Sequence, residues 1–287
     1  MELSFRTLGP GFVAEVVDAP DLRTLDDPAT FDAIRAGMDD YAVLVFRAQP
    51  FSDAEQLDFA RRFDGELHAK TGVAALGPNR FGNEALTDIS NVDENGVLLP
   101  ADHRRRQYGL ANRLWHTDAS FENPPGRYSM LSARVVPPAG VADTEFADMR
   151  AACDALDPAE RARLEGLCAH HSIAYSRQVL GFEFSGAEAK TLEGVEQPLI
   201  VSNPRTGRRA LYLASHASRI IGWPLPDGRL LLRDLIEHAT RPHFVYRHAW
   251  QPHDFVIWDN RATMHRARPF DDTLERRELR RVTTLDV

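Results

Sequence analysis

Short runs rich in β-branched and aromatic residues recur along the chain, and this pattern constrains the fold most. The clearest runs are 41–46, 128–136, 198–202, 210–214, 255–258 and 281–285. Such runs are typical of strands, and they are too many and too dispersed for a helical bundle. The sequence has no internal repeat and no linker rich in Gly or Pro. We therefore expect residues 1–287 to form a single domain.

Three segments carry helix signals. Ser52 and Glu55 have the spacing of a capping box, and Asp157 precedes a proline in the pattern of a helix start that runs towards Leu167. Leucines recur at helical spacing between 229 and 238. Because helices do not alternate strictly with strands, a doubly wound parallel sheet is disfavoured. We expect a mainly β fold, an antiparallel sandwich or barrel with flanking helices.

Charge and composition limit the partners and the compartment. The formal net charge is −8, and an acidic surface gains nothing from a nucleic acid or an anionic membrane. No apolar run approaches the roughly 20 residues that cross a bilayer, and the first residues lack a signal-peptide pattern. Cys153 and Cys168 do not have the spacing of a disulfide framework or a zinc knuckle. We expect a soluble, cytoplasmic protein that binds any anionic ligand at a local basic site.

The segment 114–120, Leu-Trp-His-Thr-Asp-Ala-Ser, contains the most informative pair. On an extended segment, residues two apart point to the same side, so His116 and Asp118 can bind one metal ion together. His265, late in the chain, supplies a third ligand. Two imidazoles and one carboxylate that leave other positions open are the ligand set of non-haem Fe(II) oxygenases. For the isolated pair, a surface histidine bonded to a nearby acid is the better explanation, but the third ligand and the basic segment after it favour a metal site.

A basic segment, 275–285, follows the last of these ligands. Read as a strand, it places Arg277 and Arg281 on one face. A dicarboxylate that chelates iron at one end needs a planar, permanently charged donor at its distal carboxylate, so we assign Arg277 to that group. Arg281 is assigned to the proximal carboxylate or to the acid group of the main substrate. Arg276 and Arg280, on the other face, are expected to form solvated ion pairs with the neighbouring glutamates.

With His116-Thr-Asp118, His265 and Arg277 in this order, the chain resembles the taurine and 2,4-dichlorophenoxyacetate dioxygenase family, which depends on Fe(II) and 2-oxoglutarate. The similarity also covers the segments 41–47, 88–91, 114–121, 128–138, 143–152, 228–240 and 256–287. The stretch 144–150 and the chain length are most similar to the aryloxyacetate-cleaving branch. The resemblance implies a double-stranded β-helix, or jelly roll, with iron near one mouth of the barrel.

The resemblance also implies roles for single residues. It places the iron ligands at His116, Asp118 and His265. It places the residues that bind 2-oxoglutarate or an acid group at Thr144, Arg277 and Arg281. It places substrate-binding residues at His216, Lys70 and Arg80, the last two in a variable loop, 67–102, that covers the active site.

The implied reaction uses Fe(II), 2-oxoglutarate and O2 to hydroxylate a small anionic substrate, with succinate and CO2 as co-products. For an aryloxyacetate, hydroxylation beside the ether oxygen gives a hemiacetal that collapses to a phenol and glyoxylate. A taurine, alkylsulfonate or alkyl sulfate dioxygenase of the same fold is the first alternative. A ligand-binding jelly roll without catalysis has less support, because it has no need for three metal ligands. The acidic surface and the resemblance together point to a homo-oligomer.

Overall fold

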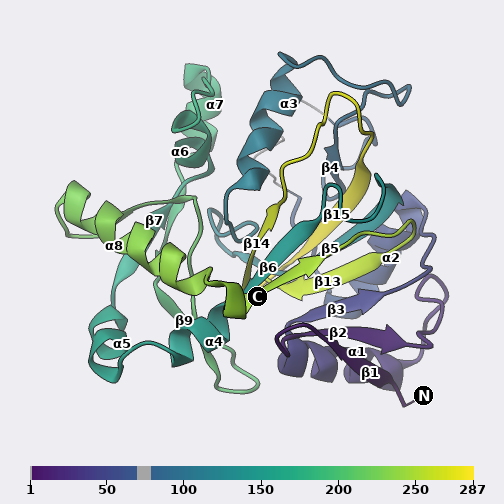
Figure 1. The fold of residues 1–287 in the computed structure, drawn as a ribbon, viewed down its shortest axis with the longest axis horizontal. Helices are drawn as coiled ribbons and strands as arrows, with labels where there is room; N and C mark the ends of the chain where they lie inside the picture. Colours follow the sequence, from purple (N-terminus) through teal and green to yellow (C-terminus); the bar gives the residue numbers. More distant parts are fainter. Residues whose placement is uncertain (1, 70–78) are drawn as a thin grey trace.

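The structure is a computed structural model that describes residues 2–69 and 79–287. Its larger sheet has seven strands in the order β1, β2, β3, β13, β5, β15 and β4 (Figure 1). Their bounds are β1 Ser4–Leu8, β2 Val13–Val17, β3 Val43–Phe46, β13 Phe255–Asp259, β5 Gly126–Val135, β15 Glu278–Leu285 and β4 Thr87–Ser90. Neighbours pair antiparallel except β2 and β3, which are parallel.

A smaller antiparallel sheet packs against the larger one. It has the order β12, β6 and β14, with bounds Val245–His248, Thr144–Asp148 and Thr263–Ala267. Phe146 of β6 contacts Trp258 of β13, with ring centroids 5.5 Å apart, and both rings are fully buried. Side chains of the two sheets thus share one core, as in a sandwich or barrel.

Alternation along the strands determines which side chains enter this sandwich. Val256 and Trp258 of β13 lie in the core between the sheets, whereas Phe255 and Ile257 lie in the core on the outer face. A period of two is what pleated strands impose. The same rule places one face of β15 inside the barrel, where the site lies.

Helices α1 (Pro28–Tyr41) and α2 (Asp53–Asp64) contribute to the outer core of the larger sheet. The capping box expected for α2 is present: Glu55 N–H donates to Ser52 Oγ at 3.2 Å and Ser52 N–H donates to Glu55 Oε2 at 2.7 Å. Ala42 ends α1 in the left-handed conformation, with φ of 63°. The strand expected at 41–46 therefore begins at Val43 instead.

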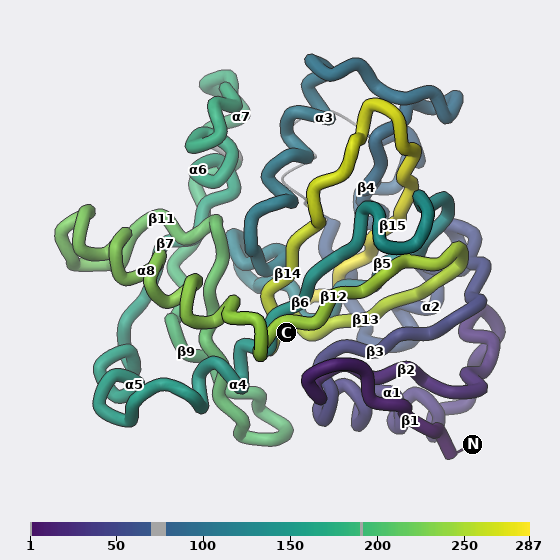
Figure 2. The backbone as a smooth tube through the Cα atoms, in the orientation of Figure 1, coloured from purple at the N-terminus to yellow at the C-terminus, as the bar shows by residue number. Residues whose placement is uncertain are grey.

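The remaining elements gather to one side of the sheets, most clearly α5 to α8 (Figure 2). Their strands are β7 Cys168–His171, β8 Val195–Pro198, β9 Ile200–Ser202, β10 Arg209–Leu211 and β11 Ala217–Ile220. The helices are α4 Met149–Asp154, α5 Pro158–Leu164, α6 Ile173–Gln178, α7 Gly186–Thr191 and α8 Leu225–Ala239, with a 3-10 turn η3 at Pro242–Phe244. The leucine stripe expected on α8 is buried at Leu232 and Leu235. The run expected as one strand at 198–202 is divided at Leu199 between β8 and β9.

Two further elements, α3 (Arg104–Gly109) and η2 (Leu110–Arg113), lead directly to the segment that contains His116. Within 2–69 and 79–287, no helix combines the length and the apolar character that a membrane crossing requires.

Candidate metal and co-substrate site

Two of the expected ligands are held together by their backbones. His116 and His265 form an isolated antiparallel bridge, in which the His116 N–H donates at 3.0 Å and the His265 N–H at 2.8 Å. Residues directly opposite each other in such a pair project to the same face. The two imidazoles consequently lie side by side, with ring centroids 4.2 Å apart.

Asp118 lies in a turn rather than on the extended segment that the sequence suggested. Ala119, which follows it, has the left-handed φ of 53°. Gly126 allows this turn to approach β5, because a Cβ at that position would lie 2.8 Å from Cγ2 of Thr283 and 3.1 Å from the carbonyl oxygen of Asp118. Ser129 Oγ donates to Asp118 Oδ2 at 2.8 Å and fixes the carboxylate.

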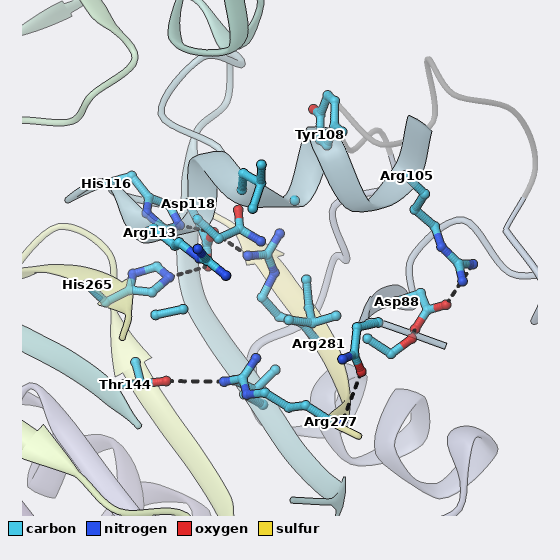
Figure 3. Close-up of a pocket in the computed structure, with 18 of the residues that line it drawn as sticks. Asp88, Arg105, Tyr108, Arg113, His116, Asp118, Thr144, His265, Arg277 and Arg281 are labelled. Atoms are coloured by element: carbon cyan, nitrogen blue, oxygen red, sulfur yellow. Dashed lines mark hydrogen bonds and ion pairs between the residues drawn. The ribbon is translucent and has the colours of Figure 1, made fainter. Parts of the chain in front are cut away.

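The three side chains converge on one point (Figure 3). Nε2 of His116 lies 3.8 Å from Oδ1 of Asp118, and Nε2 of His265 lies 3.7 Å from Oδ2. One ligand atom from each residue lies within 4.8 Å of the other two, and all three residues are buried. Ligands about 2 Å from one ion are separated by roughly 3–4 Å. The arrangement therefore fits a single small cation.

Burial and charge set the protonation states that a metal needs. Burial lowers the pKa of His116 to about 4, against the opposing effect of Asp118, and lowers that of His265 well below its ordinary value. Burial raises the pKa of Asp118, but Arg281 and the two histidines outweigh it, and the pKa falls to about 2. At neutral pH the site thus offers two neutral imidazoles and a carboxylate. Nδ1 of His116 donates to the Leu114 carbonyl at 2.8 Å, which leaves its Nε2 for the metal.

Arg281 of β15 contacts these ligands directly. Its Nη1 donates to Oδ1 of Asp118. Its Nε is buried and has no hydrogen-bond partner among the described residues. The side chain therefore stabilises the negative charge of the ligand carboxylate and keeps a donor for an anion at the metal.

Arg277, just before β15, lies near Thr144 of β6 on another side of the cavity (Figure 3). Its Nη2 donates to Thr144 Oγ1 at 3.4 Å, and Trp250 Nε1 donates to the same hydroxyl at 3.0 Å. Burial lowers the pKa of Arg277 to about 10, against the opposing effect of Asp143, so the guanidinium is charged at neutral pH. It forms no ion pair with any acid in 2–69 or 79–287, and its Nε has no partner there. This geometry suits a carboxylate from a ligand.

The ion pairs expected for Arg276 and Arg280 are present, but only that of Arg276 is solvated, because its side chain is 47% exposed whereas Arg280 is buried. Arg276 donates to Oε1 of Glu278 through Nε at 2.7 Å, and Arg280 donates to Oε2 at 3.2 Å. Each of these two arginines is thus paired with the carboxylate of Glu278, whereas Arg277 has no acidic partner among the described residues.

A cavity of about 160 Å³ opens beside the three ligands. His216 lines it, with its ring 5.8 Å from that of His116 and 5.1 Å from that of Phe121. Nδ1 of His216 lies 3.0 Å from Ser176 Oγ. The apolar lining consists mainly of Leu110, Phe121, Leu131, Ile173, Trp258 and Phe270. The cavity thus combines an apolar wall with basic groups.

The structure does not bring Arg80 to this cavity. Its Nε donates to Asp88 at 2.8 Å, its Nη2 donates to Ser90 at 3.1 Å, and its guanidinium stacks on Phe81. Arg80 is absent from the cavity lining in the described part of the chain. Lys70, the other loop residue expected at the substrate, lies outside the described residues.

Several cavity residues were not singled out from the sequence. Arg105, Arg106 and Arg113, on α3 and η2, line the cavity, as do Asn112, Arg177 and Arg268. Asp88 pairs with Arg105, and Asp272 pairs with both Arg106 and Arg113. The run Arg104-Arg105-Arg106 in the sequence could have indicated that basic residues line the cavity. Nothing in the sequence around Arg177 indicated that it would line the cavity.

Comparison with known proteins agrees with this geometry. Residues 4–283 match the taurine catabolism dioxygenase TauD, TfdA family. The chain belongs to this family. The alpha-ketoglutarate-dependent 2,4-dichlorophenoxyacetate dioxygenase of Burkholderia sp. (strain RASC) is 46% identical over 286 residues, which are 99% of this chain and 95% of that protein. The (S)-phenoxypropionate/alpha-ketoglutarate-dioxygenase of Sphingobium herbicidovorans is 37% identical over 270 residues, 91% of this chain and 88% of that protein.

A solved structure is similar along the whole chain. The crystal structure of AAD-2 in complex with Mn(II) and N-oxalylglycine matches with a TM-score of 0.94 and 43% identity, covering 100% of this chain and 99% of that one. The jelly-roll fold expected from the sequence is thereby confirmed. The family resemblance and the assignment to the 2-oxoglutarate-dependent non-haem iron dioxygenases are confirmed as well.

Proposed function

We propose that this enzyme hydroxylates an aryloxyacetate of the 2,4-dichlorophenoxyacetate type, using Fe(II), 2-oxoglutarate and O2. The products are a phenol, glyoxylate, succinate and CO2. One observation carries the proposal: the buried triad His116, Asp118 and His265 opens on a cavity that also contains a charged, unpaired Arg277. The identity to a 2,4-dichlorophenoxyacetate dioxygenase over almost the whole chain supports the substrate class.

The ligand set suits Fe(II), since two imidazoles and one carboxylate leave room for further ligands on the cavity side. His116, Asp118 and His265 would hold the ion, which supplies the redox chemistry with O2 when bound. Arg277 and Thr144 would bind the distal carboxylate of 2-oxoglutarate. Arg281 would orient the Asp118 carboxylate and assist the acid group closest to the metal.

The cavity also suits the other substrate. Phe121 and Ile173 offer an apolar wall for an aryl ring, and His216 offers a polar group beside the ligand His116. Hydroxylation of the carbon beside the ether oxygen gives a hemiacetal that breaks down without a dedicated base. The acids that line the cavity besides Asp118 agree with this, because Asp88 and Asp272 are both engaged by arginines.

We extend the proposal to the organisation of the protein. Residues 1–287 would form one catalytic domain, with 67–102 as the segment that covers the cavity; Asp88 and Asn91, within that range, line it. A cytoplasmic location agrees with the two cysteines, which are both free. Assembly into a homo-oligomer completes the proposal and is tested by measuring the mass in solution.

The reaction itself is tested with purified protein reconstituted anaerobically with Fe(II). Addition of oxygen, 2-oxoglutarate and phenoxyacetate should give succinate and phenol in equal amounts, and His116→Ala should give neither. Taurine and an alkyl sulfate serve as competing substrates in parallel. If succinate forms only when taurine or the alkyl sulfate is added, the substrate is a sulfonate or a sulfate instead. If no anionic substrate yields succinate, the proposed reaction is refuted.

A further inference from the structure

Five arginines among the described residues are at most 7% exposed: Arg150, Arg177, Arg261, Arg277 and Arg280. Three of them form ion pairs, which join Arg150 to Asp148, Arg261 to Asp259 and Arg280 to Glu278. Arg177 and Arg277 have no carboxylate partner within 2–69 and 79–287. A buried guanidinium without a counter-charge is strongly unfavourable, so both positions call for an anion from outside the chain. The proposed function assigns an anion to Arg277 but none to Arg177.

Neutral groups alone hold Arg177 in place. Its Nη1 donates to Ser176 Oγ at 2.8 Å, and its Nη2 donates to Asn112 Oδ1 at 3.4 Å. The guanidinium carbon lies 4.6 Å from the ring centroid of Tyr108, and Nε has no partner among the described residues. These contacts fix the orientation of the guanidinium and leave its charge unmatched.

Arg177 lines the same cavity as the metal ligands. Ser176 Oγ, which accepts from Arg177, also lies 3.0 Å from Nδ1 of His216, whose ring lies next to His116. Burial lowers the pKa of Arg177 and outweighs Tyr108 and Asp118, the groups that raise it. The positive charge therefore lies close to the metal site, where an incoming carboxylate would stabilise it.

The two unpaired arginines reach the cavity from different parts of the fold. Arg277 precedes β15 and contacts β6, whereas Arg177 lies on α6, which follows β7 (Figure 1). In Figure 1, α6 and β15 lie on either side of β14, the strand that contains His265. One dicarboxylate bound at Arg277 and the metal leaves the other basic site available for a second anion.

The surroundings of Arg177 favour an anion attached to an aromatic group. Tyr108, Phe121 and Ile173 belong to one apolar cluster, and all three line the cavity. Ile173 lies on the same helix as Arg177, and Tyr108 stacks on its guanidinium. An aryl ring against this wall has its acid group within reach of the guanidinium.

We propose that Arg177 binds the carboxylate of the main substrate, with Tyr108, Asn112 and Ser176 as the residues that position its guanidinium. This inference rests on the proposed function and adds the residue that selects anionic over neutral substrates. Arg281 forms an ion pair with Asp118, so its main role is then to hold the carboxylate of this metal ligand in place.

The test measures binding without turnover, by calorimetry on protein loaded with Mn(II) and N-oxalylglycine. The probes are phenoxyacetate and its neutral analogue phenoxyacetamide. Arg177→Gln should weaken phenoxyacetate binding by about 10- to 100-fold and leave phenoxyacetamide binding unchanged, because a charge-assisted hydrogen bond is lost. Arg177→Lys, which keeps the charge, should recover part of the affinity.

Two controls make the result decisive. N-oxalylglycine should bind Arg177→Gln as it binds the wild type, which shows that the site is folded. Arg233→Gln, on the exposed face of α8 with a side chain 60% accessible, should change neither affinity. The proposal is overturned if phenoxyacetate binds Arg177→Gln within about twofold of the wild type, or if both probes weaken equally. Wild-type protein that binds N-oxalylglycine and taurine but neither probe would overturn the substrate class, and this assignment with it.

Discussion

Replacement of Arg277 by methionine should stabilise the ligand-free protein and, at the same time, weaken its binding of 2-oxoglutarate. The side chain is 7% exposed and has no acid partner among the described residues. Methionine fills a similar volume without a charge, so the variant removes a desolvation penalty and leaves little empty space. Higher stability without the ligand together with weaker ligand binding is the result expected when a residue serves to bind a ligand and does not stabilise the fold.

The magnitude follows from the pKa of the buried group. Burial lowers the pKa of Arg277 from the ordinary 12.5 to about 10, with Asp143 opposing. At about 1.4 kcal/mol per tenfold change in the protonation equilibrium, the charge destabilises the folded state by roughly 3 kcal/mol. The penalty is fully present below pH 10 and declines as the pH rises towards 12.5. Loss of the Thr144 hydrogen bond offsets about 1 kcal/mol, which leaves a net gain of roughly 2 kcal/mol at pH 7.

Urea unfolding at pH 7 measures both effects. Wild-type protein with Mn(II) and N-oxalylglycine at a hundred times its Kd should gain about 2.7 kcal/mol over protein with Mn(II) alone. Arg277→Met should show a higher free energy of unfolding without the ligand and little further gain with it. In turnover, its KM for 2-oxoglutarate should rise by roughly 100-fold.

The neighbouring Arg276 provides the matched control. Its side chain is 47% exposed and paired with Glu278, so Arg276→Met should change the free energy of unfolding by less than about 1 kcal/mol and keep the response to N-oxalylglycine. The reasoning is refuted if ligand-free Arg277→Met is less stable than the wild type, or if N-oxalylglycine stabilises it as strongly.

Three further predictions concern the metal, the pH and Arg80. Asp118→Asn should abolish tight Fe(II) binding in equilibrium dialysis while circular dichroism stays that of the wild type; retained iron would contradict the ligand assignment. His171 is fully buried and its pKa is lowered to about 3 by burial, so the folded state loses stability as the pH falls below about 6.5. Between pH 7 and pH 5 this residue should lower the free energy of unfolding by roughly 2 kcal/mol, and metal-free His171→Gln should lack that part of the decline. Arg80→Gln should lower stability by about 1 kcal/mol, since it breaks the pair with Asp88, and change the KM for phenoxyacetate by less than about twofold; a tenfold rise would restore Arg80 to the substrate site.

The parts of the site that follow a period of two were predictable from the sequence. Leu279 and Arg281 share the inner face of β15 because pleating alternates side chains, and Arg277, one residue before the strand, lies on the cavity side as well. The order of His116, Asp118 and His265 was sufficient to suggest one metal ion. The local backbone was not predictable, because the turn at Asp118 depends on the space that Gly126 leaves on a distant strand.

The position of Arg177 in the cavity could not be predicted from sequence patterns. Its partners Tyr108 and Asn112 come from another segment, and the helix that contains it spans only Ile173–Gln178. A short helix has too few turns for its hydrophobic spacing to be distinctive. Arg80 is the opposite case: its position in the segment 67–102, which was expected to cover the active site, suggested a role at the substrate, but its guanidinium pairs with the nearby Asp88.

The backbone bridge between His116 and His265 has a consequence for how the protein handles its ion. Amide and carbonyl groups, not the metal, bring these distant parts of the chain into register. Folding therefore accounts for the loss of chain entropy on joining them, and the backbone brings two of the three ligands together without help from an ion. A chelator should thus strip the protein reversibly, and the stripped form should regain its activity on adding Fe(II) without a refolding step.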